Sequence, residues 1–272
     1  MRKALAGTAL LGLLAAALAA GCLGSGSAGG AGADGATSDP ARRPAFLVYE
    51  TSGRKTVLND LGRSSEIQIA DRVWARAGAM RTEDRRSGRA AILRLDRKLY
   101  WDLDSGRHVC SEATFRDISA AADVDRRKLV AILTAAEQNG SDPARRRQLE
   151  TLRGQRQPVV EVKEDAERQV ILGHPCRRLR FYEDGELRID GWAAEDLDSP
   201  CDPGEFLAAT GDFSPGLLAE LRRRPGLFLR KKTYGRLLAV PRVAESEVVK
   251  LETPPQLDPA LFEVPPGYTR AK

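Results

Sequence analysis

Histidine is nearly absent from this chain, which has two histidines among 272 residues, and that scarcity excludes several kinds of site. A zinc centre held by three histidines is impossible, and no H-E-x-x-H metalloprotease motif occurs. The chain also lacks a G-x-S-x-G nucleophile elbow and a G-x-x-x-x-G-K phosphate-binding loop. The adjacent acids Glu195 and Asp196 would point to opposite faces of a strand, which argues against a catalytic pair. The sequence therefore predicts a protein that is not an enzyme and that has no cofactor.

The chain also lacks a large excess of positive or negative charge. The 43 Lys and Arg residues are interleaved with 38 Asp and Glu residues, as in R-T-E-D-R-R at 81–86. Without Arg2 and Lys3 the formal net charge falls from +5 to +3. Nucleic-acid binding favours a basic stripe or patch. We therefore expect a solvated charged surface and no nucleic-acid partner.

The one long hydrophobic run lies at the N-terminus, where it has the three parts of a secretory signal. Arg2 and Lys3 precede an Ala- and Leu-rich run over 4–20, and small residues lead to a cysteine in L-A-A-G-C at 18–22. A run of about 17 residues is at the short limit for a bilayer span, which favours cleavage. We interpret residues 1–21 as a lipoprotein signal peptide and Cys22 as the cysteine that carries the lipid, palmitate included. Ordinary cleavage after 17–19 is the alternative.

Residues 22–44 begin with the lipidated cysteine and consist mainly of Gly, Ser and Ala. Such a composition buries too little apolar surface to fold, so it predicts a flexible tether. Neither Leu23 nor Gly24 is acidic, and the resemblance to known lipoproteins then implies the outer membrane in a Gram-negative cell. We expect an exported monomer, anchored to the membrane through Cys22 and facing the periplasm.

Strand signals dominate residues 45–272, which we expect to form one domain. Short apolar, β-branched or aromatic runs predict strands at 46–50, 66–70, 90–95, 98–103, 106–110, 158–163, 168–172, 176–182, 186–193, 227–233, 236–241 and 246–251. Turn residues separate them, with Ser52-Gly53 expected to be one turn. Asp184-Gly185 is typical of a type I′ hairpin. The sequential hairpins predict an antiparallel meander.

One long helix is expected over 114–138. Its apolar residues share one face at helical spacing, namely Phe115, Ile118, Ala122, Leu129, Ile132 and Leu133. Asn139-Gly140 can end it in a left-handed cap. A single apolar stripe predicts that this helix lies on one face of the sheet. Shorter helices are expected at 144–152 and within 203–223.

Four segments carry a resemblance to a known family. They are V-W-A-R-A-G-A-M-R-T-E (73–83), I-L-R-L-D-R-K-L-Y-W-D-L-D (92–104), I-L-G-H-P-C-R-R-L-R-F-Y (171–182) and L-F-E-V-P-P-G-Y (261–268). The chain resembles the LolA/LolB-like superfamily of lipoprotein carriers. The resemblance implies an α+β fold, in which a curved antiparallel sheet forms an open half-barrel with helices on its concave face. In the carriers, acyl chains enter the space between sheet and helices. This chain is longer, at 139–157 and 199–225.

Large apolar side chains supply candidates for the lining of such a cleft. They are Trp101, Phe115, Ile118, Leu129, Phe181 and Trp192. Core packing is the favoured explanation for most large side chains of this kind, since a sheet covered by helices needs them, and the cleft lining is the alternative. Tyr100 and Trp101 are strand neighbours, so they cannot both face inward.

Three cysteines remain once Cys22 is lipidated, an odd number for an oxidising compartment. We expect one disulfide and one free thiol. Cys176 with Cys201 is the favoured pair, and Cys110 with Cys176 is the alternative. His108-Val109-Cys110 and His174-Pro175-Cys176 also repeat a His-x-Cys spacing. Two such strands side by side would offer a zinc ligand set, although we expect no metal.

The leading functional interpretation is a membrane-tethered envelope protein that binds a lipid or another hydrophobic ligand without catalysis. A structural lipoprotein that contacts another envelope protein and has no ligand cavity is the second interpretation. A metal- or redox-responsive lipoprotein is the third.

Overall fold

The computed structural model describes residues 42–58, 64–137, 142–235 and 242–271. The signal peptide, Cys22 and most of the expected tether lie outside the described residues, as does the strand expected at 236–241.

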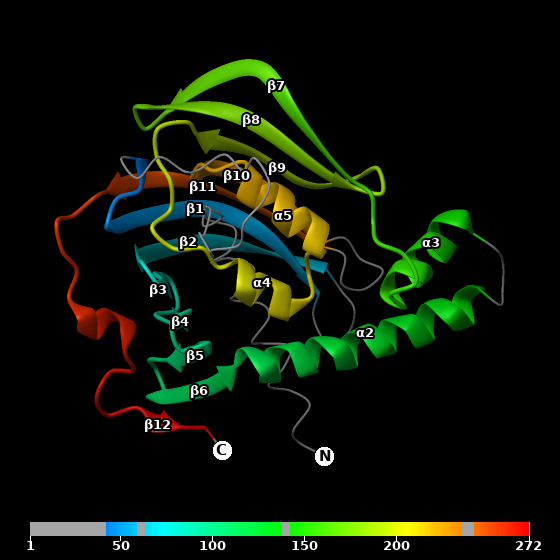
Figure 1. Cartoon of the computed structure of the whole chain (residues 1–272). Coiled ribbons are helices and arrows are strands. Elements are labelled where there is room, and N and C mark those ends of the chain that lie inside the picture. Colours follow the sequence, from blue (N-terminus) through cyan, green and yellow to red (C-terminus); the bar gives the residue numbers. More distant parts are fainter. Residues whose placement is uncertain (1–41, 59–63, 138–141, 236–241, 272) are drawn as a thin grey trace, which may run out of the picture.

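The described residues form an α+β fold around one open sheet of twelve strands (Figure 1). The first meander contains β1 (Phe46–Leu58), β2 (Ser64–Arg76), β3 (Ala79–Asp84), β4 (Ala90–Arg94), β5 (Leu99–Asp104) and β6 (Val109–Thr114). The second contains β7 (Val160–Ile171), β8 (His174–Glu183), β9 (Glu186–Ala194), β10 (Phe228–Gly235) and β11 (Arg242–Glu252). Antiparallel pairing of β1 with β11 joins the two meanders, and the short β12 (Thr269–Arg270) adds to β6 in parallel. The open antiparallel sheet that the sequence predicts is confirmed.

Of the turns expected from the sequence, the one with the strongest signal forms as predicted and another does not. Asp184 and Gly185 have φ angles of 52° and 81°, as a type I′ turn requires. The turn expected at Ser52-Gly53 is wrong, because both residues lie inside β1. A Cβ at Gly53 would lie 2.0 Å from the carbonyl oxygen of Glu245, so this glycine allows β11 to approach closely.

Four α-helices occur in the described residues: α2 (Phe115–Glu137), α3 (Pro143–Leu152), α4 (Gly204–Thr210) and α5 (Pro215–Arg223). Helix α2 begins where Thr114 and Asp117 exchange hydrogen bonds, since each side chain accepts from the other's backbone N–H. Within the described ranges, no helix combines the length and apolar character needed to cross a bilayer.

Helices α4 and α5 occupy the inner side of the curved sheet, and α2 runs along its open side (Figure 1). The apolar face of α2 contacts α4 more extensively than it contacts the sheet. Three of its residues, Phe115, Ile118 and Leu129, are buried, whereas Ile132 is 55% exposed. The expectation that 114–138 lies directly on the sheet therefore needs correction. The short apolar patches within 203–223 form α4 and α5 and pack directly against the inner face of the sheet.

The C-terminal segment packs against the other face of the sheet. Phe262, in the 3-10 helix η2 (Pro259–Phe262), is fully buried, and the Arg76 guanidinium lies 4.9 Å from its ring centroid. Arg94 Nη1 donates to the carbonyl of Phe262 at 3.2 Å, and Arg81 Nη1 donates to the carbonyl of Leu261 at 3.3 Å. The L-F-E-V-P-P-G-Y segment therefore stabilises the outer face of β3, β4 and β5.

We predict that Phe262→Ala lowers the free energy of unfolding by about 3–5 kcal/mol, because it removes a fully buried ring and leaves a cavity. Urea unfolding followed by tryptophan fluorescence measures this loss. The matched control is Gln256→Ala, at an exposed position on the same segment, which should change stability by less than about 0.5 kcal/mol. Equal stability of the two variants would show that the C-terminal segment does not contribute to the core.

Candidate functional site

A cleft of about 540 Å³ lies between α2, α3 and the corner that joins α4 to α5. The corner is built from local signals. Gly211 ends α4 with a left-handed φ of 71°, and the Ser214 side chain caps α5 by accepting from the backbone N–H of Leu217 at 3.1 Å. Asp212 N donates to Thr210 Oγ1 at 3.4 Å within the same corner. These bonds fix the backbone that forms the base of the cleft.

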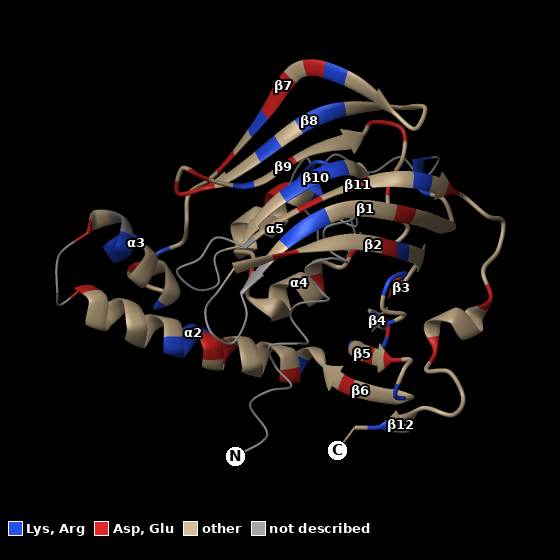
Figure 2. Ribbon diagram, turned by 180° about the vertical axis from the view of Figure 1, so that it is seen from behind, with Lys and Arg blue, Asp and Glu red and all other residues tan. Residues whose placement is uncertain are grey.

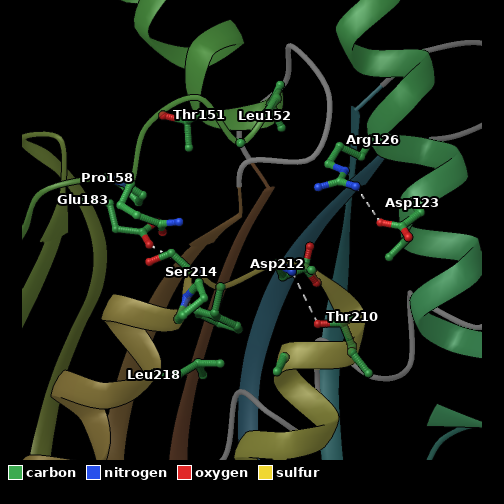
Figure 3. Close-up of a pocket in the computed structure, with 18 of the residues that line it drawn as sticks. Asp123, Arg126, Thr151, Leu152, Pro158, Glu183, Thr210, Asp212, Ser214 and Leu218 are labelled. Carbon is green, nitrogen blue, oxygen red and sulfur yellow. Dashed lines mark hydrogen bonds and ion pairs between the residues drawn. The ribbon is translucent and has the colours of Figure 1, made fainter. Parts of the chain in front are cut away.

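Apolar side chains from four helices line the cleft. They are Leu129 of α2, Leu152 of α3, Ala208 and Ala209 of α4, and Leu218 of α5. Charged groups lie around them, and Figure 3 shows Asp123 and Arg126 across the cleft from Glu183 and Ser214. Arg126 pairs with Asp123 at 2.9 Å on the surface of α2. An apolar wall beside paired charges suits a ligand that is itself partly apolar.

A buried ion pair holds the corner against the β8–β9 hairpin. Arg188 Nη1 lies 2.5 Å from Glu183 Oε2, and both side chains are almost completely buried. Arg188 Nη2 also donates to the carbonyl of Asp212 at 2.9 Å, while Glu183 Oε1 accepts from Ser214 N at 3.3 Å. Since every one of these bonds links the hairpin to the corner or satisfies a buried charge, the pair positions this wall of the cleft.

Among the six residues expected to line a cleft, Leu129 does so. Phe115 and Ile118 are buried in the main core instead, and the Phe115 ring meets Phe206 of α4 edge to face at 5.3 Å. Phe181 packs against Phe228 and the leucines of α5. These side chains support the inner helices and lie outside the cleft lining.

The two tryptophans among these candidates contribute to the structure elsewhere. Trp101 belongs to a cluster with the C-terminal Val264 and Tyr268, and its Nε1 donates to Glu112 at 2.7 Å. Its neighbour Tyr100 faces inward and stacks on Phe206. Trp192 lies 5.9 Å from the Arg178 guanidinium and joins the main core. The short helices expected within 203–223 are confirmed as α4 and α5. The sequence did not indicate that the corner between them lines a cleft, because that depends on how α2 and α3 pack beside it.

Cys110, Cys176 and Cys201 are buried free thiols, so no disulfide joins the described cysteines. Cys176 and Cys201 belong to the same core cluster, whereas Cys110 lies in another. Burial raises the pKa of Cys176 to about 11 and also raises that of Cys110, which keeps both thiols protonated and unreactive.

His174 and Cys176 lie on β8, whereas Cys110 lies on β6 and His108 lies in the turn that precedes it. Since β6 and β8 are not neighbours in the sheet, the arrangement that a shared zinc site requires is not formed. His108 contacts Tyr268, and His174 Nδ1 lies 3.0 Å from Asp196 Oδ1. No group of three or more metal-binding side chains occurs in the described part of the chain.

Comparison with known proteins finds distant similarity of fold. The sequence matches no protein-family model and no curated protein. An uncharacterised conserved protein from Thermus thermophilus is 11% identical, with a TM-score of 0.42 over 84% of this chain and 90% of the other. A DUF1329 family protein from Desulfovibrio piger is 10% identical, with a TM-score of 0.32 over 81% and 90%. A domain assigned to outer membrane lipoprotein sorting, from Vibrio parahaemolyticus, is 10% identical, with a TM-score of 0.30 over 80% and 89%.

A second feature lies on the inner face of the sheet, outside the lining of the cleft. Thr51 on β1, Asp71 on β2, Thr82 on β3 and Asp102 on β5 are buried, and we call them the polar inner patch. Each lies two residues along its strand from a side chain of the main core, so all four face inward. They lie beside the apolar residues of the main core on the same face.

Within this patch, the buried position of Asp71 disfavours the ionised form of its carboxyl group. Burial, followed by the charge of Asp84 on the neighbouring strand, raises the pKa of Asp71 to about 6, and Lys55 opposes the shift. A raised pKa means that the folded state disfavours the ionised carboxylate.

The raised pKa predicts how stability depends on pH. Because the folded state binds the Asp71 proton more tightly than the unfolded state, stability should fall as the pH rises from about 4 to about 6, by about 3 kcal/mol in total. Asp71→Asn should lack this fall and be more stable than the wild type at pH 7. Chemical unfolding at pH 4, 5, 6 and 7 measures the difference. The control is Glu167→Gln, at an exposed acid on β7, which should follow the wild-type profile. Parallel profiles for Asp71→Asn and the wild type would contradict the assignment.

Proposed function

We propose that this protein is a lipid-anchored envelope protein that holds a hydrophobic or amphiphilic ligand in the cleft between α2, α3 and the α4–α5 corner. The cleft carries this proposal. Its volume, about 540 Å³, lies within the range of about 300–1,000 Å³ typical of small-molecule sites, and apolar side chains from four helices line it.

The charged residues of the cleft support an amphiphile over a wholly apolar ligand. Arg126 and Asp123 pair on α2, and Arg222 pairs with Asp202 at 3.1 Å on the opposite wall. A polar head group can exchange hydrogen bonds with the exposed Arg126–Asp123 pair at little cost, because surface pairs contribute only about 0–1 kcal/mol to stability. The apolar part of the ligand would then contact Leu129, Leu152 and Leu218.

The anchor completes the proposal. The L-A-A-G-C motif at 18–22 favours lipidation of Cys22, which would tether the domain to a membrane. The lipids of that membrane would then be available to the cleft as ligands. Binding without catalysis agrees with the absence of enzyme motifs from the sequence.

Native mass spectrometry of the full-length protein, purified from membranes in a mild detergent, tests ligand binding. We expect a co-purified lipid or other hydrophobic molecule at a defined stoichiometry. Ala208→Arg should reduce its occupancy at least fivefold, because an exposed position on the apolar wall then carries a charge. The matched control, Ala120→Arg, makes the same change at an exposed position of α2 outside the lining and should retain the ligand.

Equal occupancy in the Ala208→Arg and Ala120→Arg variants would show that any bound lipid lies elsewhere. Recovery of a stoichiometric envelope protein in place of a small ligand would favour a structural role for the chain.

The anchor has its own test. Cys22→Ser should abolish incorporation of a clickable palmitate analogue and move the protein from the membrane fraction to the soluble periplasmic fraction. Cys110→Ser, at a buried core thiol, serves as the control and should leave labelling unchanged. Labelling of the Cys22→Ser variant would contradict lipidation at this residue.

A further inference from the structure

Five polar atoms gather on the inner face of the sheet with their hydrogen-bonding capacity unused. They are Thr51 Oγ1, Asp71 Oδ2, Thr82 Oγ1, Asp102 Oδ1 and Tyr100 OH, none of which has a partner in the described part of the chain. The five side chains are between 1% and 6% exposed. A buried polar atom without a partner costs about 1–3 kcal/mol, and native structures contain few of them. Such a concentration in one place points to a ligand that supplies the missing bonds.

The strand register places three of these side chains together. Thr51 lies directly opposite Asp71 in the β1–β2 pair. Thr82 lies opposite Val73 in the β2–β3 pair, which makes it a diagonal neighbour of Asp71. Directly opposed side chains on one face have Cβ atoms about 4.5–5.5 Å apart, and diagonal neighbours are about 7–8 Å apart. A small group over Asp71 can therefore reach both hydroxyls.

Asp102 belongs to the edge of this patch and is partly satisfied. Its Oδ2 accepts from Arg89 Nη2 at 2.7 Å, so one oxygen is engaged and the other is not. In the strand register, Ala91 lies between Asp102 and Thr82. The side chain of Ala91 is small, so no large group stands between the two polar side chains on this face.

The chemistry of the three central groups favours a cationic hydrogen-bond donor. A carboxylate oxygen only accepts, and a threonine hydroxyl can accept as well as donate. Two acids, Asp71 and Asp84, face this point with one base, Lys55, so the local charge is negative. Magnesium and calcium ions prefer several oxygen ligands, and the described residues form no group of three metal-binding side chains here. A primary ammonium, with three N–H donors and one positive charge, matches one carboxylate and two hydroxyls.

We propose that Asp71, Thr51 and Thr82 bind a primary ammonium group, supplied by the ethanolamine head group of a phospholipid or by a free diamine. Neither Asp71 nor the two threonines line the cleft, so this site stands independently of the ligand proposed there. Binding of the ammonium would favour the ionised form of Asp71.

Isothermal titration calorimetry on the full-length protein, held in nanodiscs of phosphatidylcholine that carry no primary amine, tests the proposal. The free-amine arm compares 1,4-diaminobutane with 1,4-butanediol. The lipid arm compares lysophosphatidylethanolamine with lysophosphatidylcholine, whose quaternary ammonium has no N–H donor. We expect the amine to bind at least tenfold more tightly than its partner in one arm or in both, and the arm that responds identifies the source.

Variants locate the site. Asp71→Asn should weaken binding of the preferred amine at least tenfold, and Thr51→Val, which keeps the side-chain shape, should weaken it about threefold to tenfold. The matched control is Glu66→Gln, which removes one acid from an exposed position of the same strand, and it should change the affinity less than twofold.

Equal affinity for amine and partner compound in both arms would overturn the proposal, and so would an Asp71→Asn variant that folds and binds the amine as the wild type does. Because the cleft variant Ala208→Arg leaves this patch intact, loss of lipid from the cleft and loss of ammonium preference can be told apart.

Discussion

The antiparallel ladder between β1 and β11 is the interaction on which the architecture depends, because it joins strands from opposite ends of the domain. Val48 pairs with Glu252 and Lys55 with Ala244, across about two hundred residues of sequence. Without this ladder the chain would form two separate meanders of six and five strands, neither of which could enclose the inner helices. Gly53 belongs to the same contact, since only a residue without a side chain allows the carbonyl of Glu245 so close.

The joined sheet places two chemically different surfaces on its inner side. Apolar residues around Tyr49, Val73 and Tyr100 support α4, while Thr51, Asp71 and Thr82 give the neighbouring area a polar character. The C-terminal segment around Phe262 covers the outer side. Arginines of β2, β3 and β4 contact this segment and hold it against the sheet (Figure 2). Each face of the sheet is therefore stabilised by an element that lies late in the sequence.

Local signals predicted much of the fold, and long-range packing decided the rest. The hairpin at Asp184-Gly185 and the helix over 114–138 follow from backbone preference and periodicity. The bulge in β7 between Glu164 and Arg168 resembles a turn in sequence, so one strand was predicted as two. Asp71 fell between predicted strands, because an acid is rare on the buried face of a strand, and the patch around it was missed. The cleft depends on how α2 meets α4, which no local pattern encodes.

The connection from β6 to β7 has a mechanical consequence. These two strands lie near opposite edges of the sheet, and α2 and α3 provide the covalent link between them. A curved open sheet can flatten if its two edges move apart. Helices α2 and α3 connect strands near the two edges across the open side, so they oppose that movement. The curvature of the sheet and the position of α2 are therefore coupled. A molecule that binds beneath α2 and displaces it would change the curvature of the whole sheet.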